Sequence, residues 1–465
     1  MTIDRRPTLS PAHPATASGN QNLGDLPVWK LDDLYPGQTS SEFLGAVEKA
    51  GSDALAFETK WKGKLSIALE TVGENSLAQA LREMDALEDL LGRIASYAGL
   101  TYYSDMTNPA NGKFFGDIQA KLTDMSSRLL FFPLEMNRLA DDAVDAAMDR
   151  DPALGHFRPW IVDLRKDKPF QLDDRIEQLF LEKSQTGAAA FNRLFDETLA
   201  SLRFKIGEEE MPLEPTLTLL QDANPEKRRQ AAEALSKTFK DNIRIFTLVT
   251  NTLAKDKDIS DRWRGFEDIA DSRHLANRVE REVVDALAEA VREAYPRLSH
   301  RYYKMKAKWL GMDQMNFWDR NAPLPESPSQ VVSWDEARDT VLSAYGDFAR
   351  EMAGIARDFF DKGWIDAPVK PGKAPGAFAH PTVPSAHPYV LVNYLGKPRD
   401  VMTLAHELGH GVHQVLAGAQ GALMCATPLT LAETASVFGE MLTFRALLSK
   451  TRDKAERKAM LAQKV

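Results

Sequence analysis

The 465-residue sequence predicts a mainly α, multi-helical fold with one small β-sheet close to the C-terminal end. Three observations support this prediction. Apolar residues recur at steps of three and four over long stretches, as they do on the buried face of a helix. Helix-start signals precede several of these stretches. Residues 366–399 differ, because Pro, Gly and His cluster there around a run of strand-forming residues.

Three stretches show the helical pattern. One helix is predicted to begin after Asn75 and Ser76, and its apolar stripe consists of Leu77, Leu81, Met84, Leu87, Leu91, Ile94 and Ala98. Another is predicted to begin at Asn224, an N-cap residue that Pro225 follows at the first helical position. A further stripe consists of Leu275, Val279, Val283, Leu287 and Val291. We interpret these stripes as core faces without a chemical role.

Strand signals occur in two places. Residues 389–395 (YVLVNYL) predict one strand, and residues 316–319 (NFWD) predict a second. A small sheet before the helix at 400–418 would have an edge strand, and an extended peptide can pair with such an edge. His380 and His387 lie in the same segment without metal-ligand spacing, so a structural role is expected of both ahead of a position facing a cleft.

The segment from His406 to His410 has the form H-E-x-x-H and carries the clearest chemical signal. Residues four apart share one face of a helix, so His406 and His410 can bind one metal ion together. Glu407 lies about 100° round the helix from His406, beside the metal, where it can take a proton from a metal-bound water.

The pattern around the motif predicts an amphipathic helix. Asp400 is the expected N-cap and Gly418 the expected C′ residue. One apolar stripe consists of Val401, Leu404, Leu408, Val412 and Val415, with His406, His410 and His413 on the opposite face. Two glycines inside the helix, Gly409 and Gly411, have two open readings, which are close helix packing and the shaping of a cleft floor.

A catalytic zinc usually has three protein ligands, so a third is required. Residues 429–442 predict a second helix with Glu433, Ser436 and Glu440 on one face and with Leu431, Ala435, Phe438 and Leu442 on the other. Glu433 is the expected third ligand. Glu440 lies roughly 10 Å farther along the axis. We therefore expect Glu440 either to hydrogen-bond a ligating histidine without touching the ion or to be a solvated glutamate.

His413 follows His406 by seven residues, again roughly 10 Å along a helix, so one ion cannot bind both. We expect His413 to be a packed residue or a support for the site.

The sequences HELGHGVHQ (406–414) and LTLAETASVFGE (429–440) resemble the zinc site of the oligoendopeptidase F family, relatives of thimet oligopeptidase. The opening WKLDDLY (29–35) and the stretch KAPGAF (373–378) are similar to that family too. The resemblance implies His406, His410 and Glu433 as ligands of one Zn²⁺ per chain and Glu407 as general base. It also implies a zincin-type fold with a deep cleft, short peptides as substrates, and a backbone contact of Gly376–Phe378 with the peptide. An ordinary loop that packs Phe378 into the core is an equal alternative for that segment.

The same resemblance implies a longer chain. Family members continue beyond the second zinc helix into a segment whose tyrosine and histidine side chains hold the substrate and stabilise the oxyanion. This sequence ends at Val465, inside a helix predicted to begin near Thr451. We therefore expect a fragment that needs its C-terminal segment for activity.

Composition narrows the other expectations. The net charge of −9 and the absence of basic clusters with interleaved aromatics argue against nucleic acid as a partner. No apolar run reaches the ~18 residues of a membrane span. The single Cys425 permits no internal disulfide and indicates a reducing compartment, so we expect a cytoplasmic protein and a buried, unreactive Cys425. The expected organisation is a flexible tail (1–24), an N-terminal helical domain (25–210) and a catalytic domain (211–465).

The function expected from these observations is a zinc-dependent endopeptidase. Two alternatives remain, which are a zinc carboxypeptidase of similar helical build and a non-catalytic peptide-binding protein with a relic metal site. A structural zinc usually has four protein ligands, and only three candidates are found here, which favours catalysis.

Overall fold

The computed structural model describes residues 23–325 and 331–464, so residues 1–22 of the predicted tail lie outside the described residues. The described chain is predominantly helical, as predicted. Its longer helices and their neighbours are α1 (Ser41–Trp61), α2 (Leu65–Glu70), α3 (Leu77–Ser104), α4 (Pro109–Leu129), α5 (Phe131–Arg138), α6 (Asp141–Arg150), α7 (Pro152–Gly155), α8 (Arg158–Arg165), α9 (Asp174–Ser184), α10 (Ala188–Ser201), α11 (Leu213–Leu219), α12 (Pro225–Asp241), α13 (Ile243–Arg264), α14 (Asp271–Ala276), α15 (Arg281–Ala294), α16 (Ser299–Trp309), α17 (Trp334–Phe348), α18 (Arg350–Asp361), α19 (Pro398–Ala417), α20 (Leu429–Lys450) and α21 (Lys454–Lys464).

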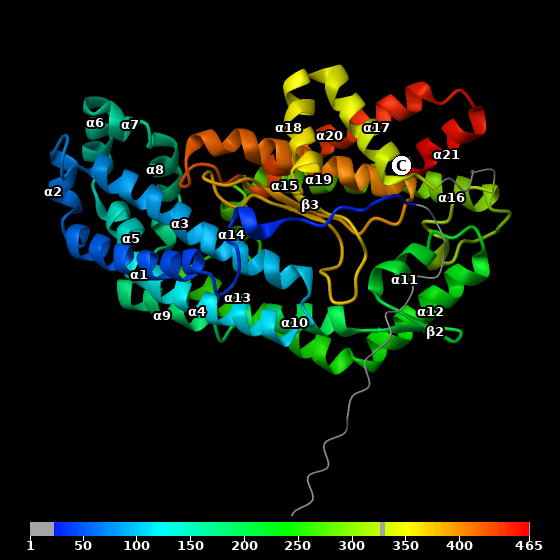
Figure 1. Ribbon diagram of the computed structural model, residues 1–465, viewed down its shortest axis with the longest axis horizontal. Coiled ribbons are helices and arrows are strands. Elements are labelled where there is room, and N and C mark those ends of the chain that lie inside the picture. The colour runs from blue at the N-terminus through cyan, green and yellow to red at the C-terminus, as the bar shows by residue number, and fades with distance from the viewer. Residues whose placement is uncertain (1–22, 326–330, 465) are drawn as a thin grey trace, which may run out of the picture.

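The helices form an elongated body (Figure 1). The first helices, α1 to α8, gather at one end, and α10, α12 and α13 run along one long side. The last helices, α17 to α21, lie on the opposite long side, with the sheet beside α19. None of the described helices is long and apolar enough to cross a membrane.

A three-stranded sheet precedes α19, as the composition of this segment predicted. Its order is β3 (Ile365–Asp366), β5 (Tyr389–Leu391) and β4 (Phe378–His380), with β3 parallel and β4 antiparallel to the central β5. The central strand is completely buried, and β4 forms an edge. The strand predicted at 389–395 is confirmed for its first three residues. A separate hairpin joins β1 (Phe204–Ile206) to β2 (Glu209–Met211).

The strand predicted at residues 316–319 is wrong, because the segment forms the 3₁₀ helix η3 (Phe317–Asp319). A long-range ion pair decides its conformation. Asp319 is fully buried, and its Oδ1 accepts hydrogen bonds from Nε and Nη2 of Arg228 at 3.1 and 2.9 Å. The turn directs the Asp319 carboxylate toward α12. The local pattern of aromatic residues contains no signal for this distant partner. Other 3₁₀ turns of the same length occur at Leu31–Asp33, Lys168–Phe170 and Gly418–Gln420.

Two of the three predicted helical stretches behave as expected. Every residue of the α3 stripe is buried, and Ser76 caps this helix by accepting the N–H of Gln79. Asn224 caps α12, with Pro225 in its first turn. The stripe from Leu275 to Val291 is wrong as a core face. Left-handed backbone at Arg278 separates α14 from α15, and Val283, Leu287 and Val291 on α15 are 55%, 64% and 42% exposed.

One large hydrophobic core connects the N-terminal helices to the sheet and to α17–α19. The opening segment contributes to it through Trp29, whose ring lies edge-on to Tyr389 at 6.0 Å. A smaller core contains Leu202, Phe204, Ala234 and Leu235. The large core includes residues from both sides of residue 210, and the domain boundary there stays a prediction.

Candidate metal centre

The helix α19 carries the H-E-x-x-H motif and begins at Pro398. The prediction that Asp400 is the N-cap is wrong, because Lys397 occupies that position. Asp400 is the third helical residue, and its carboxylate reaches back to accept the backbone N–H groups of Leu395 and Lys397, both at 2.9 Å. With proline at its first position, the helix starts three residues earlier than the sequence pattern indicated.

The helix ends at Ala417, close to the predicted position, but Gly418 does not act as a left-handed C′ residue. Gly418 keeps right-handed backbone (φ −55°), and the chain continues through the 3₁₀ turn before Gly421 takes a positive φ of 87°. The apolar stripe is confirmed, because Val401, Leu404, Leu408 and Val412 are buried and Val415 packs against the same core.

The helix α20 crosses α19 at very short range, and glycines permit this. A Cβ on Gly409 would lie 2.7 Å from the carbonyl oxygen of Ala435 and 2.9 Å from the Cα of Ser436. On another side of α19, a Cβ on Gly411 would lie 2.6 Å from the ring of Phe359 on α18. Both glycines of the motif region therefore serve close helix packing.

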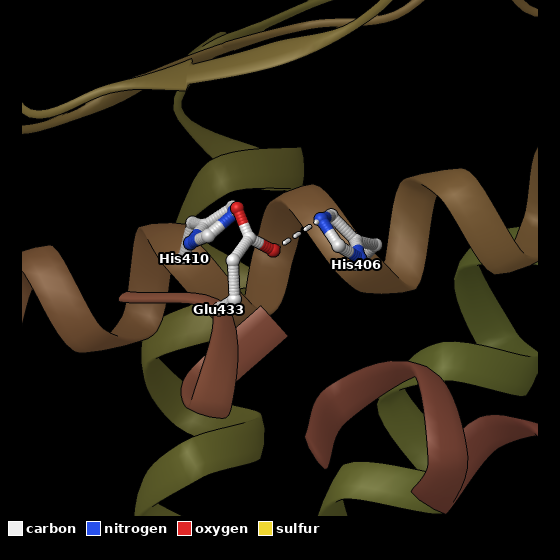
Figure 2. A group of neighbouring side chains, drawn as sticks. All are labelled: His406, His410 and Glu433. Atoms are coloured by element: carbon white, nitrogen blue, oxygen red, sulfur yellow. Dashed lines mark ion pairs between the residues drawn. The ribbon is translucent and has the colours of Figure 1, made fainter. Parts of the chain in front are cut away.

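Figure 2 shows that His406 and His410 on α19 point toward Glu433 on α20. Nε2 of His406 lies 3.3 Å from Oε2 of Glu433, and Nε2 of His410 lies 3.6 Å from Oε1 of the same carboxylate. One ligand atom from each side chain falls within 4.8 Å of the others, and among the described residues this is the one such group of His, Cys, Asp or Glu side chains.

These distances fit a shared ion. Two atoms that each bind one zinc at about 2.1 Å with tetrahedral geometry lie roughly 3.4 Å apart. Two imidazoles and one carboxylate form a ligand set that suits zinc and leaves one position open. The structure thus brings together the three side chains that the sequence selected.

Groups on α20 orient each of the three side chains. Oε2 of Glu440 lies 3.5 Å from Nδ1 of His406, the nitrogen that faces away from Glu433. The hydroxyl of Ser436, which is fully buried, lies 2.8 Å from Oε2 of Glu433. The imidazole of His410 bonds to the backbone of Ala432. Such outer contacts fix ring orientation and tautomer at metal sites.

Burial is the main electrostatic influence at the site. It lowers the pKa of His410, which favours the neutral ring that metals bind, although the Glu433 carboxylate acts in the opposite direction. It raises the pKa of Glu407 to about 7, with a further increase from the negative charge of Glu433 and an opposing hydrogen bond from the backbone of Ala379. Glu407 is 7% exposed and faces β4.

The edge strand β4 lies against α19 at Ala379. The backbone of Ala379 bonds to the Glu407 carboxylate, and its carbonyl oxygen accepts Nε2 of Gln414 at 3.2 Å. Both backbone groups at this position are therefore engaged by α19. The pairing of a peptide with Gly376–Phe378 stays a prediction.

The remaining candidates are not part of the three-residue group. His413 is half-buried. Nδ1 of His380 accepts the N–H of Thr382, and burial lowers its pKa to about 4. His387 stacks on Trp364 with ring centroids 3.9 Å apart. Burial raises the pKa of the Cys425 thiol, which disfavours the thiolate of a nucleophile.

Sequence reasoning missed the groups that act through the backbone. Tyr345 on α17 donates from Oη to the carbonyl oxygen of Ala405, next to His406, at 2.5 Å. Tyr345 is 60 residues from that partner, and no local spacing connects the two. The contacts of Ala379 and Ala432 involve main-chain atoms, for which the residue type carries no signal.

Two family models match this chain. The model described as "Oligopeptidase F" matches residues 135–204, and the model described as "Peptidase family M3" matches residues 348–465. The second match contains α19 and α20 with all three candidate ligands.

The chain is also similar to curated proteins. It is 25% identical over 442 residues to oligopeptidase PepF of Bacillus subtilis, with 92% of this chain and 64% of that protein covered. It is 25% identical to group B oligopeptidase PepB of Streptococcus agalactiae, covering 83% of this chain and 65% of that protein. The chain thus spans just under two thirds of the length of these two relatives.

Solved structures share the fold. Oligoendopeptidase-F from Enterococcus faecium superposes with a TM-score of 0.62 at 18% identity, covering 90% of this chain and 70% of that one. PZ peptidase A with an inhibitor superposes with a TM-score of 0.71 at 14% identity, covering 92% and 72%.

Proposed function

Because the chain belongs to the oligopeptidase F group of peptidase family M3, we propose that it is a zinc-dependent endopeptidase that hydrolyses internal bonds of short peptides. One observation carries the proposal. Two helices bring two imidazoles and one carboxylate together at distances that suit a single ion, with a glutamate directly beside them.

We assign the ion to His406, His410 and Glu433. When bound, zinc polarises the peptide carbonyl and lowers the pKa of water to about 7. Three protein ligands leave a position for chemistry, whereas structural zinc sites are usually closed by four. This difference favours catalysis over a relic site.

Glu407 is the proposed general base. It takes the proton of the attacking water and passes it to the leaving amine, as positioned carboxylates do in general acid–base catalysis. Its hydrogen bond to Ala379 of β4 holds the carboxylate between the histidines and the edge strand. An extended peptide that pairs beside Ala379, at Gly376–Phe378, would bring its scissile bond close to Glu407. The names of the relatives, oligopeptidase and oligoendopeptidase, support short peptides and internal cleavage.

The test compares Glu407→Gln with the native residue in the intact protein, on an internally quenched peptide whose two ends are blocked. We expect zinc content near one per chain in both proteins and loss of nearly all turnover in the variant. Glu351→Gln is the matched control, because Glu351 is an exposed glutamate on α18. Normal cleavage by Glu407→Gln would contradict the assignment. Cleavage restricted to peptides with a free C-terminus would favour a carboxypeptidase instead.

A further inference from the structure

Three helices meet at the hydroxyl group of Tyr345. This residue lies on α17 and is completely buried. Its Oη donates to the carbonyl oxygen of Ala405 on α19 at 2.5 Å, and Ala405 directly precedes His406. The bond therefore attaches α17 to the metal helix at the position next to a candidate ligand.

The third helix reaches the same point through Gly439 of α20. A Cβ on Gly439 would lie 2.2 Å from the Tyr345 hydroxyl and 3.0 Å from the Ala405 carbonyl oxygen. Only a residue without a side chain fits there. Gly439 directly precedes Glu440, the carboxylate beside Nδ1 of His406. The phenol thus lies between the two backbones that carry the site.

The Tyr345 hydroxyl acts as a hydrogen-bond donor that does not lose its proton. Burial raises the pKa of Tyr345 well above its ordinary value, so the hydroxyl keeps its proton over the working range of pH. A carbonyl oxygen has two lone pairs, so Ala405 can accept this bond in addition to its bond within the helix. A buried donor whose acceptor is removed has no water to replace it.

We propose that Tyr345 is a positioning residue for the metal centre, which sets the separation of α19 and α20 and with it the distance from His406 and His410 to Glu433. The inference rests on the proposed metal site. It concerns binding geometry and not the chemical step, because the hydroxyl of Tyr345 bonds to the backbone of Ala405 and not to a ligand side chain.

Metal binding requires the accurate helix separation that this contact would set. Metal–ligand distances tolerate deviations of only about 0.2 Å. A small shift of α20 relative to α19 would therefore weaken binding well before it unfolds the protein. A role in general stability alone would lower the melting temperature without a selective loss of metal affinity.

The test compares two tyrosine-to-phenylalanine variants. Tyr389 is the matched control, because it is also completely buried and its Oη donates to a backbone carbonyl, that of Lys30, at 2.6 Å. Zinc affinity is measured by competition with a chelating dye at a temperature where every protein is folded, and thermal unfolding is recorded in parallel. We expect Tyr345→Phe to weaken zinc binding by about 10-fold or more, as outer-sphere changes do. Tyr389→Phe should stay within about twofold of the native affinity while losing a similar hydrogen bond.

Equal zinc affinity in Tyr345→Phe and the native chain would overturn the proposal. If this variant does not fold, Gly439→Ala replaces it, with the same expected loss and the same refuting result. An intact protein that binds zinc but cleaves no peptide would contradict the proposed enzyme, whereas this inference depends only on the zinc affinities. A native chain that binds no zinc would overturn both.

Discussion

The substitution Gly409→Ala tests whether the close crossing of α19 and α20 builds the candidate metal site. An added Cβ would lie 2.7 Å from the carbonyl oxygen of Ala435, whereas ordinary contacts begin at 3.4 Å. The difference, 3.4 minus 2.7, requires a displacement of about 0.7 Å. Backbone atoms of α20 form the obstacle, so the helix must move as a unit.

Two terms determine the expected change in the free energy of unfolding. Alanine gains roughly 1 kcal/mol over glycine inside a helix. Overpacking a closely packed contact costs about 1–3 kcal/mol. Gly45→Ala on α1 should show only the gain in helix propensity, because its Cβ would meet nothing within 4 Å. The difference between the two variants therefore isolates the overpacking cost, which we expect to be about 2 kcal/mol.

The assay pairs urea denaturation with competitive zinc titration of the native chain and both variants. A displacement of about 0.7 Å exceeds the tolerance of metal–ligand distances, so Gly409→Ala should lose about 10-fold or more in zinc affinity. Gly45→Ala should keep the native affinity. The reasoning is refuted if Gly409→Ala matches Gly45→Ala in both stability and zinc affinity, since α20 would then not need the close approach.

Two further predictions concern single side chains. Glu440→Gln should weaken zinc binding about 10-fold with little change in stability, because the neutral amide supports Nδ1 of His406 less well than the carboxylate; zinc titration beside Glu351→Gln checks this. Burial lowers the pKa of His380 to about 4 from 6.5, so the unfolded chain binds the extra proton between these values and stability falls as the pH drops through this window. From pH 7 to 5 this group should remove about 2 kcal/mol, and denaturation of His380→Asn, which keeps an acceptor for Thr382, should show a correspondingly smaller loss. An identical pH dependence in both proteins would contradict that account.

Local sequence patterns were sufficient for elements whose burial follows one helix face. The stripe of α3, the start of α12 and the apolar face of α19 all lie where the periodicity placed them. The same logic selected Glu433, because a helix presents residues i, i+3 and i+7 on one side. The ligand role of these residues stays a proposal, but helical geometry predicted which side chains share one face of each helix.

The pattern misled where a distant partner decides the outcome. An apolar stripe states which residues share a face but not whether another element covers it, and on α15 the described residues leave that face exposed. The strand-like residues 316–319 turn instead, because the buried Arg228 requires the carboxylate of Asp319.

By itself, the sequence determined a mainly helical protein with His406, His410 and Glu407 on one helix and Glu433 on the next, since these follow from periodicities of a few residues. The tertiary structure alone decided how closely the two helices approach and what holds them there. Gly409 and Gly439 admit the crossing, and Tyr345 bonds across it from 60 residues away. Contacts of this kind depend on backbone separations of a few tenths of an ångström, which no spacing along the chain encodes.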